Sequence, residues 1–146
     1  MANVCNLTVT NTQNDGAGSL REAIICAEDG ATIKVANHLT YQTIFLNQTD
    51  LTINKNLTLL GPDGGTITIN GSALPGIIQV PNNVTLNIER INFVGGTAQQ
   101  ASVINNDGII YMEDSKIIND IANPNPNLPR LSGTGTYNLS NNVEIH

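Results

Sequence analysis

The sequence predicts an all-β fold, a right-handed parallel β-helix (solenoid) with one N-terminal capping α-helix. Two observations lead to this prediction: short strand patterns that recur at spacings of about 27 and about 24 residues, and a single helix signal near the N-terminus. Periods of about 20 to 50 residues are typical of solenoids. Right-handedness follows from the general preference of parallel crossover connections. We expect about three to five coils, given the length of the repeat.

The helix is expected to begin at Ser19 and to continue to Glu28. Ser19 is followed three residues later by Glu22, which is the spacing of a capping box, and Gly30 supplies a stop signal. A strand pattern over residues 7–12 precedes the helix. Four apolar residues share one face of the helix, which must therefore cover other apolar groups: Leu20, Ala23, Ile24 and Ala27. Arg21, on the same helix, is expected to pair with Asp15.

Residues 7–24, LTVTNTQNDGAGSLREAI, carry a family resemblance. The segment resembles the N-terminal cap of bacterial surface proteins of the CSLREA type and of polymorphic outer-membrane-type adhesins. Gly18 stands where the name-giving Cys of that motif often lies. The resemblance implies a right-handed parallel β-helix and a location at the cell surface, and it implies no activity.

The repeat has three strands in each coil. Residues 51–59 match residues 78–86, and these in turn match residues 102–110. A third strand follows each of these segments, over residues 66–70, 91–94 and 116–118. One three-stranded turn in each period indicates a parallel β-helix.

Asn56, Asn83 and Asp107 are expected to stack at one tight corner, because Asn and Asp tolerate a left-handed backbone and their side chains bond to nearby backbone groups. Alternation along the strands places one set of side chains in the core. This inward set is Leu57, Leu59, Val84, Leu86, Ile88, Ile91, Phe93, Ile110, Met112 and Ile117. The outward set is Thr58, Thr85, Asn87, Asn92 and Lys116.

The sequence suggests two parts: residues 1–122 as the capped β-helix and residues 123–146 as a Pro-rich linker and an extended C-terminal tail. Closely spaced prolines in this linker favour an extended chain and end the repeat. Alternating apolar residues in the tail form a candidate assembly surface: Tyr137, Leu139, Val143 and Ile145. Two alternatives are open. The tail either reaches a neighbouring subunit by β-augmentation or covers Ile110, Met112 and Ile117 of its own chain.

Cys5 and Cys26 are the two cysteines of the chain. Cys5 shares strand parity with residues expected to point inward, and Cys26 lies beside the inward-facing Ala27. A disulfide between them would stabilise the fold by about 3 kcal/mol in the loop-entropy account. The alternative is two buried free thiols, since free Cys is among the most buried residue types.

Composition excludes several classes of partner. The net charge of −6 argues against binding to nucleic acid or to an anionic membrane surface. Aromatic residues make up 3% of the chain and Trp is absent, which argues against a stacking platform for sugars or bases. No apolar run approaches about 20 residues, so membrane insertion is not expected. Residues 1–4 do not begin a signal peptide. Low charge with abundant Asn, Thr and Gly favours an extracellular or cell-surface location.

No catalytic constellation is expected, nor a cofactor or a metal. The nearest candidates are Glu89, Glu113 and Asp114, where the repeat places Glu89 beside Glu113. Arg90 is expected to neutralise Glu113 or Asp114, which makes this group a solvated face. The two histidines lie far apart in sequence and have no zinc-site spacing.

Six N-x-S/T sequons occur, and three of them are candidate glycosylation sites: Asn47, Asn70 and Asn138. The corner role explains Asn56 and Asn83 better. We therefore expect a non-catalytic extracellular structural protein, a cell-surface or filament subunit whose main partner is itself. The alternatives are a carbohydrate-binding or carbohydrate-cleaving module, with cell-surface glycans as partners, or an isolated adhesin cap domain.

Overall fold

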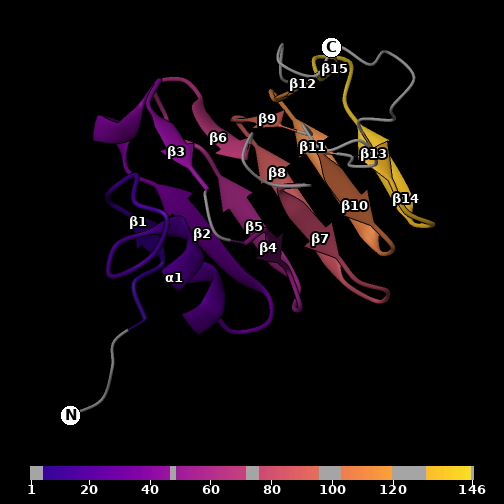
Figure 1. Cartoon of the computed structure of the whole chain (residues 1–146), viewed down its shortest axis with the longest axis horizontal. Helices are drawn as coiled ribbons and strands as arrows, with labels where there is room; N and C mark the ends of the chain where they lie inside the picture. The colour runs from indigo at the N-terminus through magenta and orange to yellow at the C-terminus, as the bar shows by residue number, and fades with distance from the viewer. Residues whose placement is uncertain (1–4, 47–48, 72–75, 96–102, 120–130, 146) are drawn as a thin grey trace.

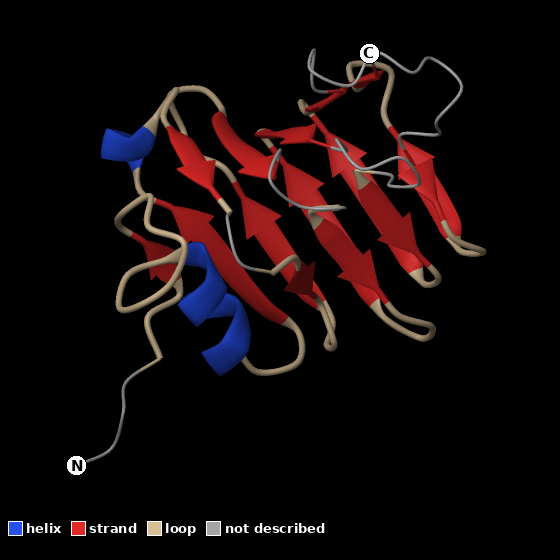
Figure 2. Cartoon of the chain, viewed as in Figure 1, coloured by secondary structure: helices blue, strands red, loops and turns tan. Residues whose placement is uncertain are grey.

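The computed structural model describes residues 5–46, 49–71, 76–95, 103–119 and 131–145. The chain is a solenoid of stacked parallel strands, running from its N-terminal end at the left of Figure 1 to its C-terminal end at the right. Three parallel sheets, of six, four and five strands, surround one apolar core (Figure 2). This confirms the predicted class, a parallel β-helix with one α-helix.

Each of the later coils gives one strand to the four-stranded sheet, then one to the six-stranded sheet, then one to the five-stranded sheet. In that order the strands are β4 (Leu51–Thr52), β5 (Leu57–Leu60) and β6 (Ile67–Gly71); β7 (Ile78–Val80), β8 (Thr85–Glu89) and β9 (Ile91–Gly95); β10 (Ile104–Asn106), β11 (Ile109–Glu113) and β12 (Lys116–Asn119); β13 (Leu131–Ser132), β14 (Thr136–Leu139) and β15 (Glu144–Ile145).

The first coil has a helix in place of its first strand. α1 (Leu20–Cys26) precedes β2 (Ala31–Val35), the 3₁₀ turn η1 (Asn37–Leu39) and β3 (Thr43–Phe45). β1 (Thr8–Val9) adds one more strand outside β2. α1 therefore takes the position that a strand of the four-stranded sheet has in every later coil.

The helix begins where the sequence predicts. The Ser19 hydroxyl oxygen accepts a hydrogen bond from the Glu22 N–H at 3.1 Å. The helix ends at Cys26, earlier than the expected Glu28, because Ala27 already has an extended backbone. Gly30, with φ +85°, lies in the turn that leads into β2 and is not the helix stop.

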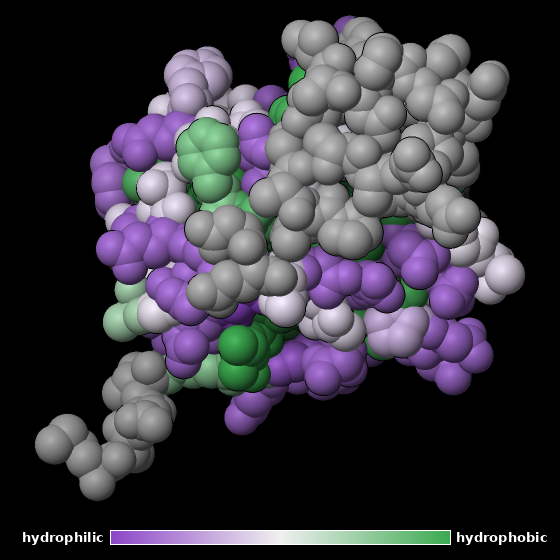
Figure 3. All heavy atoms as spheres, in the orientation of Figure 1, coloured by the Kyte–Doolittle hydropathy of each residue, from purple (hydrophilic) through white to green (hydrophobic). Residues whose placement is uncertain are grey.

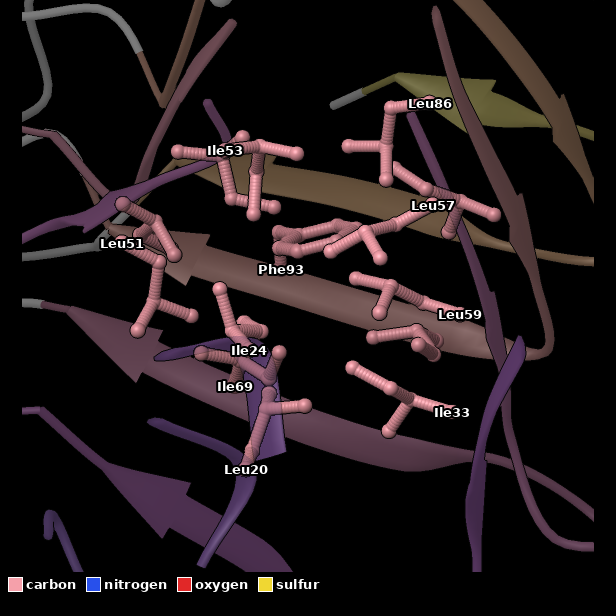
Figure 4. Close-up of a cluster of buried hydrophobic side chains, with 14 of the residues drawn as sticks. Leu20, Ile24, Ile33, Leu51, Ile53, Leu57, Leu59, Ile69, Leu86 and Phe93 are labelled. Atoms are coloured by element: carbon pink, nitrogen blue, oxygen red, sulfur yellow. The ribbon is translucent and has the colours of Figure 1, made fainter. Parts of the chain in front are cut away.

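The core confirms the predicted strand alternation. Every residue of the predicted inward set is buried, and the most exposed of them, Val84, is only 8% exposed. Figure 4 shows the interior, where Leu20 and Ile24 of α1 point toward Leu51 and Ile69. The buried face of the helix thus continues the core that the strands build.

The register differs from the predicted alignment by two residues at two places. Leu57 pairs with Leu86 and not with Val84, and Ile78 pairs with Ile104 and not with Ser102. The corner between β7 and β8 is longer than its neighbours, which produces both differences. A shift of two residues keeps every side chain on its face of the sheet, so the predicted inward set was unaffected.

The prediction that the repeat stops at residue 122 is wrong. β13, β14 and β15 pair in parallel with β10, β11 and β12 and complete a further coil. Ile104 pairs with Leu131 and Ile110 with Tyr137, each about 27 residues further along the chain. Residues 131–145 therefore belong to the solenoid and not to a separate tail, whereas the predicted linker, residues 123–130, lies outside the described residues.

Candidate functional site

The candidate site is the C-terminal end of the solenoid, where β13, β14 and β15 are each paired with only one described strand. Five apolar side chains lie here and are named the C-terminal end face: Leu131, Tyr137, Leu139, Val143 and Ile145. Four of them are the residues that the sequence analysis selected as an assembly surface. Leu131 was missed, because the residues just before it in the chain form the Pro-rich segment.

Four of these side chains, those of Leu131, Tyr137, Leu139 and Val143, pack against the chain's own core. Tyr137 pairs with Ile110, Leu139 with Met112 and Ile145 with Ile117, and these three partners are fully buried. The structure thus shows the intramolecular alternative for the tail. The covering residues are themselves only partly buried, and Ile145 is 45% exposed, because no further coil lies over them among the described residues.

Backbone groups are also exposed at this end. The Thr136 N–H donates to the Gly108 carbonyl at 2.9 Å, and the Ser140 N–H donates to the Met112 carbonyl at 3.0 Å. Backbone groups alternate in direction along a strand, so those of Tyr137 and Leu139 point away from β11. Among the described residues no strand accepts them, which makes β14 an open sheet edge.

Polar side chains fasten the last coil to the coil before it. Asn106 is fully buried; it accepts from the Gly108 N–H and donates to the Thr136 carbonyl, both at 2.9 Å. Asp107 accepts from the Thr134 N–H at 2.9 Å. These bonds give the edge strand β14 a defined position on β11.

Tyr137 closes the corner between β13 and β14. Its hydroxyl donates to the Ser132 carbonyl at 2.6 Å, while its ring lies against the core. Burial raises the pKa of Tyr137 to about 12. The folded last coil therefore stabilises the neutral phenol of Tyr137 relative to the phenolate.

The C-terminal end carries little charge although the whole chain has a net charge of −6. No charged residue occurs from Leu131 to Asn142. Glu144, on β15, forms an ion pair with Lys116 at 3.0 Å. The end is thus close to neutral.

The N-terminal end is covered by a structure that we name the N-terminal cap, formed by β1 and α1. The disulfide Cys5–Cys26, with 5.5 Å between the Cα atoms, ties the segment before β1 to the last residue of α1. This settles the alternative of bridge or free thiols in favour of the bridge. Leu20 and Ile24 of α1 and Leu39 of η1 are at most 4% exposed, while Leu7 and Ala31 at this end are partly buried.

Two basic side chains fasten α1 to the coil behind it. Arg21 donates to the Thr49 hydroxyl at 2.9 Å and to the Asp50 carbonyl at 3.0 Å, so the expected Arg21–Asp15 pair is wrong. Lys55 donates to the carbonyl of Ile25 at 3.1 Å and to that of Ala27 at 2.6 Å, at the C-terminal end of the helix. A cation at this end of a helix also interacts favourably with the helix dipole.

A second candidate surface is a groove of about 290 Å³ on the outer face of the six-stranded sheet, over β5, β8 and β11. It is lined by Thr58, Leu60, Asn87, Ile88, Glu89, Tyr111 and Glu113. On the face of the molecule that Figure 3 draws, the described residues are mostly hydrophilic.

The carboxylates beside this groove lie as predicted, but their basic partner does not. Glu113 is the register neighbour of Glu89, and oxygens of these two and of Asp114 lie within 4.8 Å of one another. Arg90 pairs with Glu89 and not with Glu113 or Asp114. Asp114 accepts a hydrogen bond from Asn142 of the last coil. Such an exposed acidic group is common without any bound ion.

The three candidate glycosylation sites differ in their surroundings. Asn138 is exposed on the outer face of β14, and Asn70 is partly buried on β6. Asn47 lies outside the described residues. The sequon at Asn138 is therefore the more accessible of the two that are described, and it lies at the open edge of the six-stranded sheet.

Comparison with known proteins gives no relatives for this chain: no protein-family model, no curated protein and no solved structure matches it. Within the described part of the chain, the helices are too short or too polar to cross a bilayer. Function is therefore inferred from the geometry of the two ends and the groove.

Proposed function

We propose that this chain is a non-catalytic structural module that associates with itself through the C-terminal end face. One observation carries the proposal: α1 of the N-terminal cap covers the core at one end, whereas among the described residues the other end presents partly buried core side chains and an edge strand in each of the three sheets. Exposed edges of this kind pair readily with another strand. Association would cover both the apolar side chains and the backbone groups.

The proposed absence of catalysis is supported by the arrangement of the carboxylates. Glu89 and Glu113 lie side by side on an exposed sheet face, and Glu89 is paired with Arg90. General acid–base catalysis needs a carboxyl group positioned within hydrogen-bond reach of a bound substrate. These carboxylates have the surroundings of a solvated surface.

An extracellular or cell-surface location is part of the proposal. The Cys5–Cys26 disulfide supports it, because disulfides persist in oxidising compartments and are rare in reducing ones.

The test of self-association is sedimentation velocity over a wide concentration range, with one exposed isoleucine changed at each end. Ile145, 45% exposed, lies on the C-terminal end face, and Ile25, 64% exposed, lies on α1. We expect wild-type protein and Ile25→Lys to associate and Ile145→Lys to remain monomeric. A wild-type protein that stays monomeric at all concentrations would contradict the proposed function.

A carbohydrate-binding role is the second candidate, favoured by the groove on the six-stranded sheet. Tyr111 is 47% exposed there, next to the polar side chains of Asn87 and Glu113. An exposed ring flanked by hydrogen-bonding groups can accept a sugar. Glycan-array binding that is lost in Tyr111→Ala and retained in Ile145→Lys would support this role.

A further inference from the structure

We propose that the partner of the C-terminal end face is a second copy of the same chain, related by a two-fold axis, so that association stops at a dimer. The inference rests on the proposed function and names its partner. A filament needs two complementary ends on each subunit, whereas a two-fold contact uses the same surface twice. In the described structure all three sheets end in a strand at the C-terminal end, whereas at the N-terminal end α1 lies beside the edge strands β1 and β3 and takes the place of a third strand.

The N-terminal cap leaves no complete three-stranded coil for head-to-tail stacking, because only the edge strands β1 and β3 lie beside α1 at that end. A C-terminal end face placed on the cap would meet α1, whose core-facing residues Leu20 and Ile24 are already buried. Arg21 and Lys55 hold the helix in place there, together with the disulfide. Among the described residues, a complete coil with three edge strands is presented by the C-terminal end face of another copy.

The topology determines which strands meet in such a dimer. The chain runs in one rotational sense around the solenoid, so a copy turned over by a two-fold axis runs in the opposite sense. All strand pairs across the contact are then antiparallel. With the axis normal to the six-stranded sheet, β14 meets β14 of the second copy, and β13 meets β15. This choice places the longest strand of the last coil, β14, against itself.

The directions of the backbone groups determine the register. The groups of Tyr137 and Leu139 point away from β11, as the bonds of Thr136 and Ser140 require. Tyr137 of one copy then forms a hydrogen-bonded pair with Leu139 of the other, and the reverse pair forms across the axis. Asn138 lies between them and faces Asn138 of the second copy in a non-hydrogen-bonded pair.

The side chains fit this arrangement. A rotation about the sheet normal keeps inward residues inward, so Tyr137 and Leu139 of both copies line one continuous core. Leu131, on β13, comes opposite Ile145, on β15, and both are in register with buried core residues, Ile104 and Ile117. Each copy thus covers apolar groups that the other leaves exposed.

The charges also fit. Two chains that each have a net charge of −6 repel one another at most orientations. The contact proposed here joins the ends that have no charged residue from Leu131 to Asn142. Glu144 remains beside Lys116 of its own chain, so no like charges are brought together at the axis.

Single-cysteine variants test the register. The two native cysteines are bonded to each other, so an introduced thiol is the only free one. We expect Asn138→Cys to form a symmetric disulfide-linked dimer on mild oxidation, because facing residues in a non-hydrogen-bonded pair have Cα atoms about 4.5 Å apart. Thr136→Cys and Ser140→Cys should each remain unlinked alone and should link to each other when mixed.

A second pair of variants tests the interface without cross-linking. Asn138→Lys places two ammonium groups at the two-fold axis, and a lysine on an exposed strand edge leaves the monomer intact. Thr32→Lys is the matched control, since Thr32 lies in the same outward row on β2 and is exposed. We expect Asn138→Lys to sediment as a monomer with an unchanged melting temperature measured at low concentration, and Thr32→Lys to behave as wild type.

The outcomes separate this inference from the proposed function. A dimer that is cross-linked through Asn138→Cys supports both. Assemblies larger than a dimer, or a dimer that Asn138→Cys does not cross-link, would overturn the two-fold contact and leave self-association standing. A wild-type protein that stays monomeric would overturn both.

Discussion

The two ends of the solenoid cover the same kind of core in different ways. At the N-terminal end, α1 replaces a strand, and Leu20 on its core-facing side is 2% exposed. At the C-terminal end, short strands alone cover the core, and Ile145 is 45% exposed. In Figure 1 the two ends lie at opposite sides of the molecule.

The difference between the two ends shows that a solenoid coil cannot bury its own apolar face. Each coil relies on its neighbours for burial, so the terminal coils need either a cap or a partner. The N-terminal coil obtains its cover from a non-repeating element that a disulfide and two basic side chains fasten. The C-terminal coil has no such element among the described residues, and we expect the two ends to respond differently to the same changes.

The largest expected effect comes from the same substitution made at each end. Leu20→Ala removes a fully buried side chain under the cap and should lower the free energy of unfolding by about 3–4 kcal/mol. Leu139→Ala removes a partly buried one and should cost about 1 kcal/mol. Urea denaturation at a concentration low enough to keep the protein monomeric measures both. Equal losses would show that the last coil is covered as well as the first.

Opening the disulfide should have the next largest effect. The double variant Cys5→Ser with Cys26→Ser removes a cross-link that closes a loop of about 21 residues, which should cost about 3 kcal/mol. Thermal unfolding of wild type with and without reductant is the control, since only wild type should respond to reduction. An unchanged melting temperature would mean that Arg21 and Lys55 hold the cap without the bridge.

How far the sequence predicts this structure depends on the kind of signal. Strand alternation predicted the whole inward set, and Ser19 predicted the start of the helix, because both depend on local chemistry. The left-handed backbone of Arg90, with φ +57°, was not predicted, since Arg has no preference for that conformation. Asp114, with φ +49°, was not predicted either, although Asp tolerates that conformation. Of the three residues expected to stack at one corner, Asn83 alone has a left-handed backbone, with φ +69°. Asn56 does not lie in register with Asn83, because its side chain accepts from the Thr85 N–H at 2.8 Å.

The last coil was missed because its signal is weak. β13 and β15 have two residues each, and polar residues separate them. One signal was available: Gly135 follows Gly108 at a spacing of about 27 residues, and both lie where a Cβ atom would meet neighbouring backbone. From this signal, the side chains of the C-terminal end face could have been assigned to the core. Their exposed fraction could not have been predicted, because it depends on whether another strand covers the last coil.

A smaller effect is expected from alkaline pH at the C-terminal end. The pKa of Tyr137 in the folded protein is raised to about 12, above the ordinary value of 10.0. The unfolded chain therefore loses this proton first, and stability that is intact below pH 10 falls by about 1–2 kcal/mol toward pH 12. Tyr137→Phe lacks this titration, so the difference in stability between it and wild type should shrink over that range. A stability difference that stays constant between pH 10 and pH 12 would mean that burial does not raise the pKa of Tyr137.

The smallest expected effect concerns the ion pair at the C-terminal end. Both side chains, Lys116 and Glu144, are 51% exposed, so a double-mutant cycle should give a coupling energy within about 0.5 kcal/mol. Screening weakens exposed pairs, so this coupling should decline further as salt is added. The association of the C-terminal end face, by contrast, rests on apolar contacts and backbone hydrogen bonds. Sedimentation at high salt should therefore show the dimer unchanged while the coupling is lost, and dissociation of the dimer by salt would mean that charge holds this end together.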